Sequence, residues 1–141
     1  MEAASRGARR SPEHRDGDVL AILPGNDPCE ANQYADICIA TGLDAARNVI
    51  ISNSDAVIAI GGGSGTLSEI AMAWAHGRLI IGYRVEGWSG TIADQRIDSR
   101  IRYPDILGDR VYGVSSEEEA IEYLNLIPAY SKRHSGIKWR K

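Results

Sequence analysis

The central stretch of the chain changes from a strand-like to a helix-like hydrophobic pattern. The continuous apolar run Ala56–Ile60 is short enough for one strand that is buried on both faces. A glycine-rich turn follows at residues 61–65, and from Thr66 onward apolar residues recur at helical spacing. Gly77 ends this helix, and Leu79–Ile81 is typical of a second buried strand. The pattern predicts a strand–glycine loop–helix–strand unit whose parallel strands are joined by a right-handed crossover.

The segments before this unit continue the alternation of strands and helices. Residues 1–10 have a helical composition, and buried strands are predicted over Val19–Leu23 and Asp36–Ala40. Asp44 is expected to cap one helix over residues 45–54, which carries its apolar residues on one face.

After the central unit, Asp109–Val114 is predicted to be an edge strand. Ser115 or Ser116 is expected to cap the next helix, which Pro128 ends. Residues 1–127 are therefore predicted to form a single domain, and residues 128–141 a basic, disordered tail. The predicted fold class is α/β, a Rossmann-like open and mostly parallel sheet with helices on both faces.

The composition of the chain argues against several classes of partner and ligand. The chain has 141 residues, with 43% hydrophobic and 25% charged residues, which is ordinary for one globular domain. A net charge of −3 gives no reason to expect nucleic acid or a membrane as a partner. Cys29 and Cys38 are expected to be reduced thiols in the cytoplasm. His14, His76 and His134 are too scattered to indicate a zinc site, so no direct metal ligation is predicted.

The glycine loop has the composition of an anion site. A helix N-terminus offers free backbone N–H groups to anions, and glycines let a phosphate approach that backbone closely. Lysine is absent before Thr66, so the loop is not a Walker A motif, and Thr66 stands where G-x-G-x-x-G needs its third glycine. Glu86 stands about where a ribose-binding acid would lie, although one acid in a polar loop is weak evidence for dinucleotide binding. A tight turn without a ligand is the alternative.

The segment Tyr83–Pro104 has no clean hydrophobic period. It is either a flexible lid or a surface loop packed by its own aromatic residues. No motif covers it, which makes it a candidate for determining ligand specificity.

The sequence Gly61–Glu69, GGGSGTLSE, resembles the G-G-x-G-T-x-x-E signature of the LOG superfamily, also called SLOG. Its members were often labelled lysine decarboxylases, and they include cytokinin-activating phosphoribohydrolases. The similarity is closer to the branch that contains the molybdenum-cofactor carrier protein, and it extends from Met1 to about Tyr83. Besides the glycine loop, its motifs are Ile22–Gly25, Thr41–Leu43, Ala46–Asn48 and Ser54–Ala56.

The resemblance implies a SLOG-type fold and a phosphate-bearing ligand, either a nucleotide or a pterin such as molybdenum cofactor. No further cofactor is required, and a homo-oligomer, a dimer or tetramer, is expected. The residues implied to contact the ligand are Pro24, Gly25, Thr41, Gly42, Asn48, Gly61, Gly62, Gly63, Ser64, Gly65 and Thr66. In the resembled family two strands and a helix stand before the segment that begins at Met1. We therefore expect that the first β-α-β unit is missing, through truncation or through loss.

Glu69 has more than one interpretation. Thr66 and Glu69 fit a capping box, in which each side chain accepts from the other residue's N–H group. The resemblance instead implies that Glu69 assists glycosidic bond cleavage together with an arginine, for which Arg47 is the candidate. Two departures weaken this catalytic role, because Gly61 replaces the proline of the enzymes and Arg47 lies about one residue too close to Glu69.

Three functions therefore remain open. The first is a binding protein for a nucleotide-like or pterin phosphate, similar to the molybdenum-cofactor carrier. The second is a phosphoribohydrolase that releases the base from nucleoside 5′-monophosphates. The third is an inactive fragment of such a protein.

Overall fold

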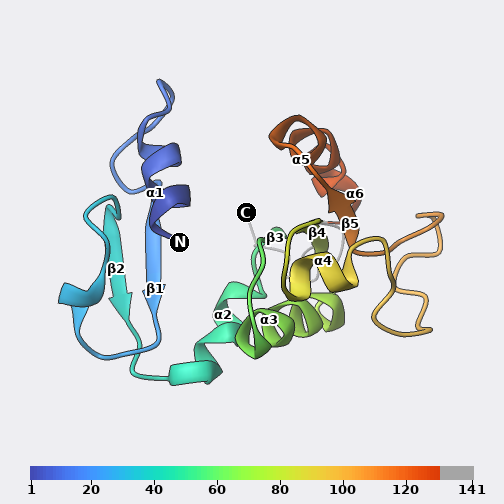
Figure 1. Cartoon of the computed structure of the whole chain (residues 1–141), viewed down its shortest axis with the longest axis horizontal. Coiled ribbons are helices and arrows are strands. Elements are labelled where there is room, and N and C mark those ends of the chain that lie inside the picture. Colours follow the sequence, from blue (N-terminus) through green and yellow to red (C-terminus); the bar gives the residue numbers. More distant parts are fainter. Residues whose placement is uncertain (131–141) are drawn as a thin grey trace, which may run out of the picture. The chain divides into compact units, whose positions relative to one another are not determined.

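The computed structural model describes residues 1–130 of the chain (Figure 1). Two compact units are distinguished, residues 1–47 and residues 48–141, and each contains its own parallel sheet. Whether the two units together form the predicted single domain stays a prediction. Within the described residues, no helix combines the length and the apolar character needed to cross a membrane.

The first unit is built around two paired strands. Its elements are α1 (Glu2–Arg9), β1 (Leu20–Leu23), the 3-10 helix η1 (Pro28–Glu30), β2 (Ile37–Ala40) and the 3-10 helix η2 (Asp44–Arg47). β1 and β2 are parallel, with Leu20 opposite Ile37. Both predicted strands are present, but Leu20, Ile37 and Ile39 are 45–49% exposed. Residues that pair across two strands, and residues two positions apart in one strand, share a face of the sheet. These three side chains therefore lie on one apolar face that is uncovered within this unit. The prediction that both strands are buried is wrong for this face.

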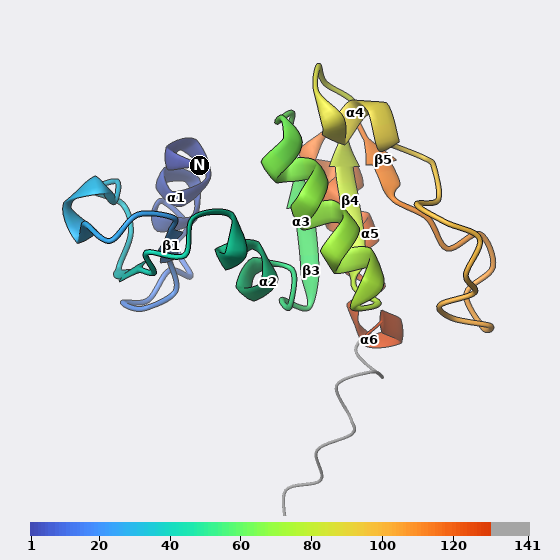
Figure 2. The same ribbon diagram turned by 90° about the horizontal axis from the view of Figure 1, so that it is seen from below.

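The second unit contains the central sheet of three parallel strands in the order β3-β4-β5. Its elements are α2 (Asn48–Ile51), β3 (Ala56–Ala59), α3 (Ser64–Ala75), β4 (Leu79–Tyr83), α4 (Trp88–Ile92), β5 (Tyr112–Val114), α5 (Glu117–Leu124) and α6 (Ile127–Tyr130). α3 and α5 lie on opposite sides of these strands (Figures 1 and 2). The predicted α/β fold class, with a parallel sheet and helices on both faces, is confirmed.

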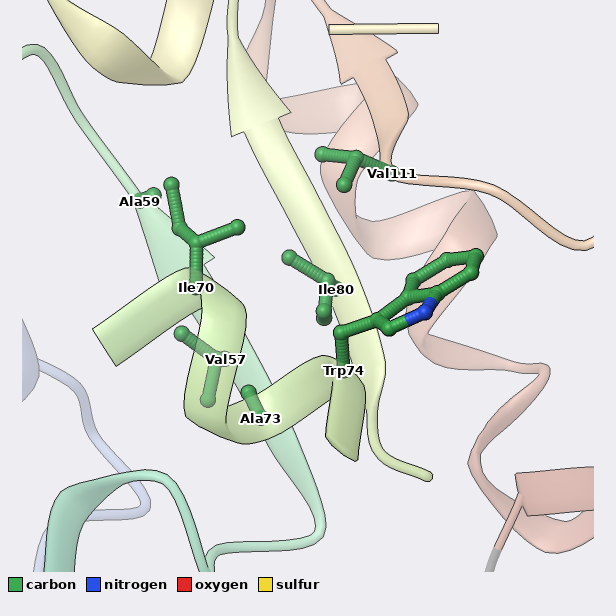
Figure 3. Packing of buried hydrophobic residues seen from close by; sticks show 7 residues of the cluster. All are labelled: Val57, Ala59, Ile70, Ala73, Trp74, Ile80 and Val111. Carbon is green, nitrogen blue, oxygen red and sulfur yellow. The ribbon is translucent and has the colours of Figure 1, made fainter. Parts of the chain in front are cut away.

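Two hydrophobic clusters form the core of this unit, one on each face of the sheet. The cluster beneath α3 consists of Val57, Ala59, Ile70, Ala73, Trp74, Ile80 and Val111 (Figure 3). The cluster beneath α5 consists of Leu79, Ile81, Tyr112, Val114, Ala120 and Tyr130. Successive residues of β4 therefore enter different clusters, and the prediction that Leu79–Ile81 is buried on both faces is confirmed.

β3 differs from that prediction because the buried residues of the cluster beneath α5 come from β4 and β5 and from helices, and none comes from β3. Val57 and Ala59 are buried beneath α3, whereas Ile58 is 45% exposed and Ile60, just beyond the strand, is 62% exposed. The apolar run thus marks a strand that is covered on one face only within the described residues.

The helix predicted after Asp44 is also different. Asp44 has a φ of +48° and opens η2 rather than capping an α-helix, and the α-helical part is the single turn α2. Val49 and Ile50 are about half exposed, while the polar Asn48 and Ser52 are buried. The buried face is therefore the polar one, because its side chains bond to α3 and to neighbouring backbone.

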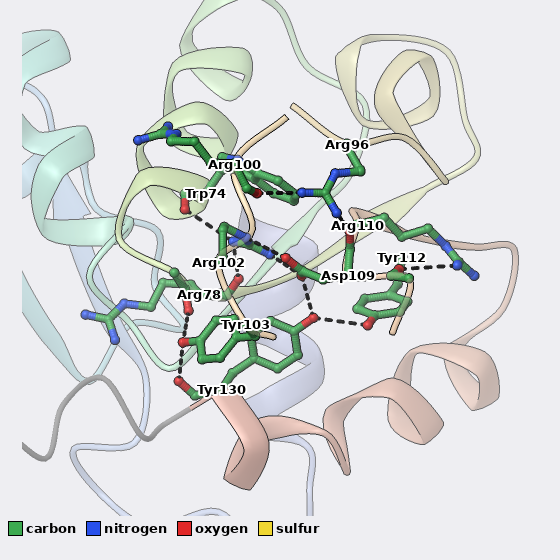
Figure 4. A network of polar contacts seen from close by, with 12 residues as sticks. Trp74, Arg78, Arg96, Arg100, Arg102, Tyr103, Asp109, Arg110, Tyr112 and Tyr130 are labelled. Atoms are coloured by element: carbon green, nitrogen blue, oxygen red, sulfur yellow. Dashed lines mark hydrogen bonds and ion pairs between the residues drawn. The ribbon is translucent and has the colours of Figure 1, made fainter. Parts of the chain in front are cut away.

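A buried polar network fastens the segment after α4 to the end of α3 (Figure 4). Arg102 Nε donates to Asp109 Oδ2 over 2.8 Å, and the Tyr130 hydroxyl donates to Asp109 Oδ1 over 2.7 Å. Arg102 Nη1 also donates to the carbonyl oxygens of Trp74 and Arg78, at 3.2 and 3.0 Å. Burial raises the pKa of Tyr130, which keeps its hydroxyl a donor.

The C-terminal part departs from the prediction at Pro128. α5 ends at Leu124, and Pro128 lies inside the short helix α6, whose Tyr130 is only 1% exposed. The remainder of the predicted tail, residues 131–141, lies outside the described residues.

Candidate functional site: the glycine loop and its supports

The glycine loop connects the end of β3 to the start of α3. Gly61 and Gly62 have φ values of +64° and +87°, in the region that favours glycine. Helix α3 begins at Ser64, earlier than the predicted start at Thr66, and Gly63 is its N-cap residue without a side-chain capping bond. The predicted capping box of Thr66 and Glu69 is therefore wrong, because Thr66 lies inside the first turn of the helix.

The segment that follows β4 is hydrogen-bonded to one side of the loop, which is called its fixed side below. The Trp88 N–H donates to Gly62 O over 2.9 Å, and the Ser89 N–H donates to Gly61 O over 3.1 Å. The Gly61 N–H in turn donates to Ser89 Oγ over 2.7 Å, and this hydroxyl donates to the carbonyl oxygen of Tyr83 over 2.7 Å. Ser89 is completely buried. These bonds fix the two positive-φ glycines to the chain that follows β4.

Gly87 makes this close approach of two backbones possible. Its φ is +113° and its ψ is −172°, a combination that only glycine adopts readily. A β-carbon at this position would lie 2.7 Å from the carbonyl carbon of Gly61 and 2.8 Å from Gly62 N. Sequence reasoning missed Gly87 and Ser89. The signal available in the sequence was a glycine and a small hydroxyl residue shortly after the strand that follows the loop.

The other side of the loop is open. A β-carbon added at Gly63 or Gly65 would meet nothing within 4 Å, and residues 63–65 are exposed. The first helical hydrogen bond here runs from the Leu67 N–H to Gly63 O, so the N–H groups of residues 63–66 precede the ladder of α3. Aligned peptide dipoles add partial positive charge at this end of the helix. The arrangement is suited to an anionic group such as a phosphate.

Asn48 supports the loop from α2. Its side chain is 2% exposed, and its Nδ2 donates to Gly65 O over 3.4 Å and to Ser68 Oγ over 3.2 Å. The residue predicted to bind ligand thus holds the first turn of α3 in place. Any direct contact of Asn48 with a ligand stays a prediction.

The two residues of the catalytic hypothesis lie in different units. Glu69 is half-buried in the second turn of α3, and Arg47 is the last residue of η2 in the first unit. Their pairing stays a prediction.

The remaining predicted ligand contacts meet within the first unit, where the parallel strands β1 and β2 end. Thr41 Oγ1 donates to Leu23 O over 2.7 Å, and the Gly42 N–H donates to Gly25 O over 2.9 Å. The Asp44 N–H donates to Pro24 O over 3.0 Å. Pro24, Gly25, Thr41 and Gly42 are therefore brought together, and their participation in a site with the glycine loop stays a prediction.

The cavity near the other end of α3 does not offer the same chemistry. It has a volume of about 270 Å³ and is lined by Trp74, Ala75, Arg100, Ile101 and Arg102. Both guanidinium groups in its wall are engaged, Arg100 with Asp98 and Arg102 with Asp109. Because neighbouring carboxylates already neutralise these cations, the open N-terminus of α3 is the better anion site.

Comparison with known proteins identifies the family of the chain. A model of the SLOG cluster4 family matches residues 1–108, which include the paired strands β1 and β2, the paired strands β3 and β4, and the glycine loop. The chain belongs to the SLOG cluster4 family. An uncharacterized protein of Archaeoglobus fulgidus is 50% identical to this SLOG cluster4 protein over 82 residues, which are 57% of this chain and 50% of the relative. The chain thus spans about half the length of that relative.

Two solved structures share the fold. The molybdenum cofactor binding protein from the phototrophic bacterium Rippkaea orientalis is 33% identical, with a TM-score of 0.68, and the match covers 91% of this chain and 71% of that one. A structural-genomics target solved by X-ray crystallography is 31% identical, with a TM-score of 0.70, and the match covers 89% of this chain and 71% of the other. The similarity to the SLOG superfamily near its molybdenum-cofactor branch is thereby confirmed.

Proposed function

We propose that this SLOG cluster4 protein binds a phosphate-bearing small molecule of the nucleotide or pterin type at the loop Gly61–Thr66. The observation that carries the proposal is the contrast between the two sides of this loop. Gly61 and Gly62 are fixed by bonds to residues 88 and 89, whereas Gly63 and Gly65 face open space. A rigid backbone that presents unused N–H groups at a helix N-terminus is already arranged for a phosphate.

Molybdenum cofactor is the first ligand to test. The solved relative at 33% identity is described as a molybdenum cofactor binding protein, and a phosphate-bearing pterin suits the loop chemistry. The cofactor would be cargo, held through its phosphate, because no chemistry of its metal is needed for binding at backbone N–H groups. Assembly into a dimer or tetramer belongs to the same proposal and is measurable by light scattering.

Isothermal titration calorimetry with AMP, inorganic phosphate and molybdenum cofactor tests the proposal. The decisive variant is Gly65→Leu, because a β-carbon there would meet nothing within 4 Å, and we expect the larger side chain to hinder the approach of a phosphate to the neighbouring N–H groups. We expect binding of all three to weaken roughly tenfold or more, while leucine, a better helix former than glycine, keeps the fold stable. Ala71→Leu, at an exposed position of the same helix, is the matched control and should bind like the parent. Unchanged binding by Gly65→Leu would exclude the loop as the site.

A further inference from the structure

Trp88 is an exposed aromatic residue beside the glycine loop. Its exposed fraction is 38%, whereas Trp74 in the core is 1% exposed. Neither hydrophobic cluster of the described residues includes Trp88. An indole ring buries a large apolar area when it packs, so a tryptophan that stays exposed next to a candidate site is informative.

The position of Trp88 is fixed relative to the loop by its own backbone. Its N–H donates to Gly62 O over 2.9 Å, and the preceding Gly87 lies against Gly61 and Gly62. α4, which begins at Trp88, lies near the N-terminal part of α3 in Figure 2. The attachment point of the indole ring is therefore held one hydrogen bond away from the loop.

The residues around Trp88 provide both an apolar and an acidic surface. Val85 is 46% exposed, and Glu86 is exposed, with its carbonyl oxygen 3.1 Å from where a β-carbon of Gly61 would stand. Ser89 is completely buried and anchors this segment. The segment thus presents its exposed side chains from a backbone that is fixed at both Gly62 and Tyr83.

We propose that Trp88 stacks on the planar heterocycle of the ligand whose phosphate occupies the glycine loop, and that it is a specificity-determining residue of this site. The inference rests on the proposed function. A purine ring and a pterin ring share the required chemistry, because both offer a flat π face to an indole. The loop recognises the charged end of the ligand, and Trp88 distinguishes ligands with a ring from those without one.

Three probes measured by calorimetry separate the two roles. AMP and a pterin monophosphate carry a ring, whereas ribose 5-phosphate carries only the phosphate and sugar. In Trp88→Ala we expect the affinity for the ring-bearing ligands to fall about tenfold, while the affinity for ribose 5-phosphate stays within about twofold of the parent. Trp88→Tyr should retain most of the affinity because it keeps an aromatic face. Whichever of the two ring-bearing ligands loses more affinity in Trp88→Ala identifies the ring that Trp88 prefers.

Leu107→Ala, which removes a side chain that is 96% exposed elsewhere in the same unit, is the matched control and should change nothing. Equal affinity of Trp88→Ala and the parent for both ring-bearing ligands would overturn the stacking role while leaving the phosphate site intact. An equal loss for ribose 5-phosphate would also overturn it, since Trp88 would then only hold the loop. If the parent binds none of the three probes, the proposed function itself fails. Thermal melting of Trp88→Tyr verifies that the segment remains folded.

Discussion

The backbone groups at the two ends of α3 differ in whether they have hydrogen-bond partners within the protein. At the C-terminal end, the carbonyl oxygen of Trp74 accepts from Arg102, and that of Gly77 accepts from the Tyr103 hydroxyl over 2.6 Å. The Arg102 guanidinium also lies 3.5 Å from the centroid of the Trp74 ring. At the N-terminal end, the N–H groups of residues 63–66 precede the helical ladder, and residues 63–65 are exposed.

The difference separates the end of α3 that we expect to serve stability from the end that we propose as the binding site. A helix end normally satisfies its unused backbone groups with side chains, water or a ligand. Here the C-terminal end is closed by long side chains from residues 102 and 103, which tie a distant segment to the core. The N-terminal end is held through Trp88 and Ser89 on one side and through Asn48 of α2, while residues 63–65 stay exposed.

The largest stability effect should come from the closed end. Asp109→Ala removes the carboxylate that pairs with Arg102 and accepts from Tyr130, and it leaves a guanidinium with a 3% exposed side chain without its counter-charge. We expect the free energy of unfolding to fall by about 3–5 kcal/mol, measured by urea denaturation. Asp105→Ala in the exposed part of the same segment should have little effect. A small loss in Asp109→Ala would mean that the network does not hold this end of the helix.

The fixed side of the loop should give the next largest effect. Gly87→Ala places a β-carbon against Gly61 and Gly62 at a φ of +113°. We expect roughly 2–3 kcal/mol of destabilisation. The same substitution at Gly65, which lies in the helix with free space around it, should instead stabilise the protein by roughly 0.5–1 kcal/mol. If both substitutions had the same sign, the contrast between the fixed and the open side of the loop would not hold.

A smaller effect on stability is expected at Glu69, and the informative measurement there is hydrolysis of AMP. Glu69→Gln keeps the size of the side chain but removes its charge, so the unfolding free energy should change by roughly 1 kcal/mol or less. A binding protein should release no adenine from AMP in either form, measured by chromatography. Release by the parent and a fall of roughly 100-fold in the variant would instead support the phosphoribohydrolase, with Arg47→Ala as the parallel variant.

The smallest effect should appear as a pH dependence at the closed end. Hydrogen bonds from Arg100 and then from Trp74 Nε1 lower the pKa of Asp98 from 3.8 to about 2. The folded state therefore binds this proton less readily than the unfolded state, and the stabilisation is present above about pH 4 and lost between about pH 4 and pH 2. Because the carboxylate is 31% exposed, solvent screens the interaction and the change should be modest.

Unfolding measured at about pH 6 and about pH 2.5 checks this prediction. The difference in stability between the parent and Asp98→Asn should shrink at the lower pH. A difference that stays constant with pH would show that Asp98 does not change its protonation preference on folding.

Local sequence patterns determined the order of most elements, but they did not reveal α4, which lies in the segment without a clean hydrophobic period. The strand–loop–helix–strand unit from Ala56 to Ile81 was predicted from apolar spacing and glycine positions, because helix and strand periods are properties of neighbouring residues. The same holds for the helix at the N-terminus and for β1, β2 and β5. The family match was likewise predictable, since the motif GGGSGTLSE is contiguous.

Only the tertiary structure decided how the loop is held and which faces are covered. Gly61 bonds to Ser89, which is 28 residues away, and Asn48 turns toward Gly65, so neither contact leaves a local pattern. The apolar run of β3 could not reveal that Ile58 is half exposed, because burial depends on what covers a face rather than on the residue itself. Which side of the glycine loop is open also depends on tertiary contacts, because the contacts of residues 87–89 occupy one side only.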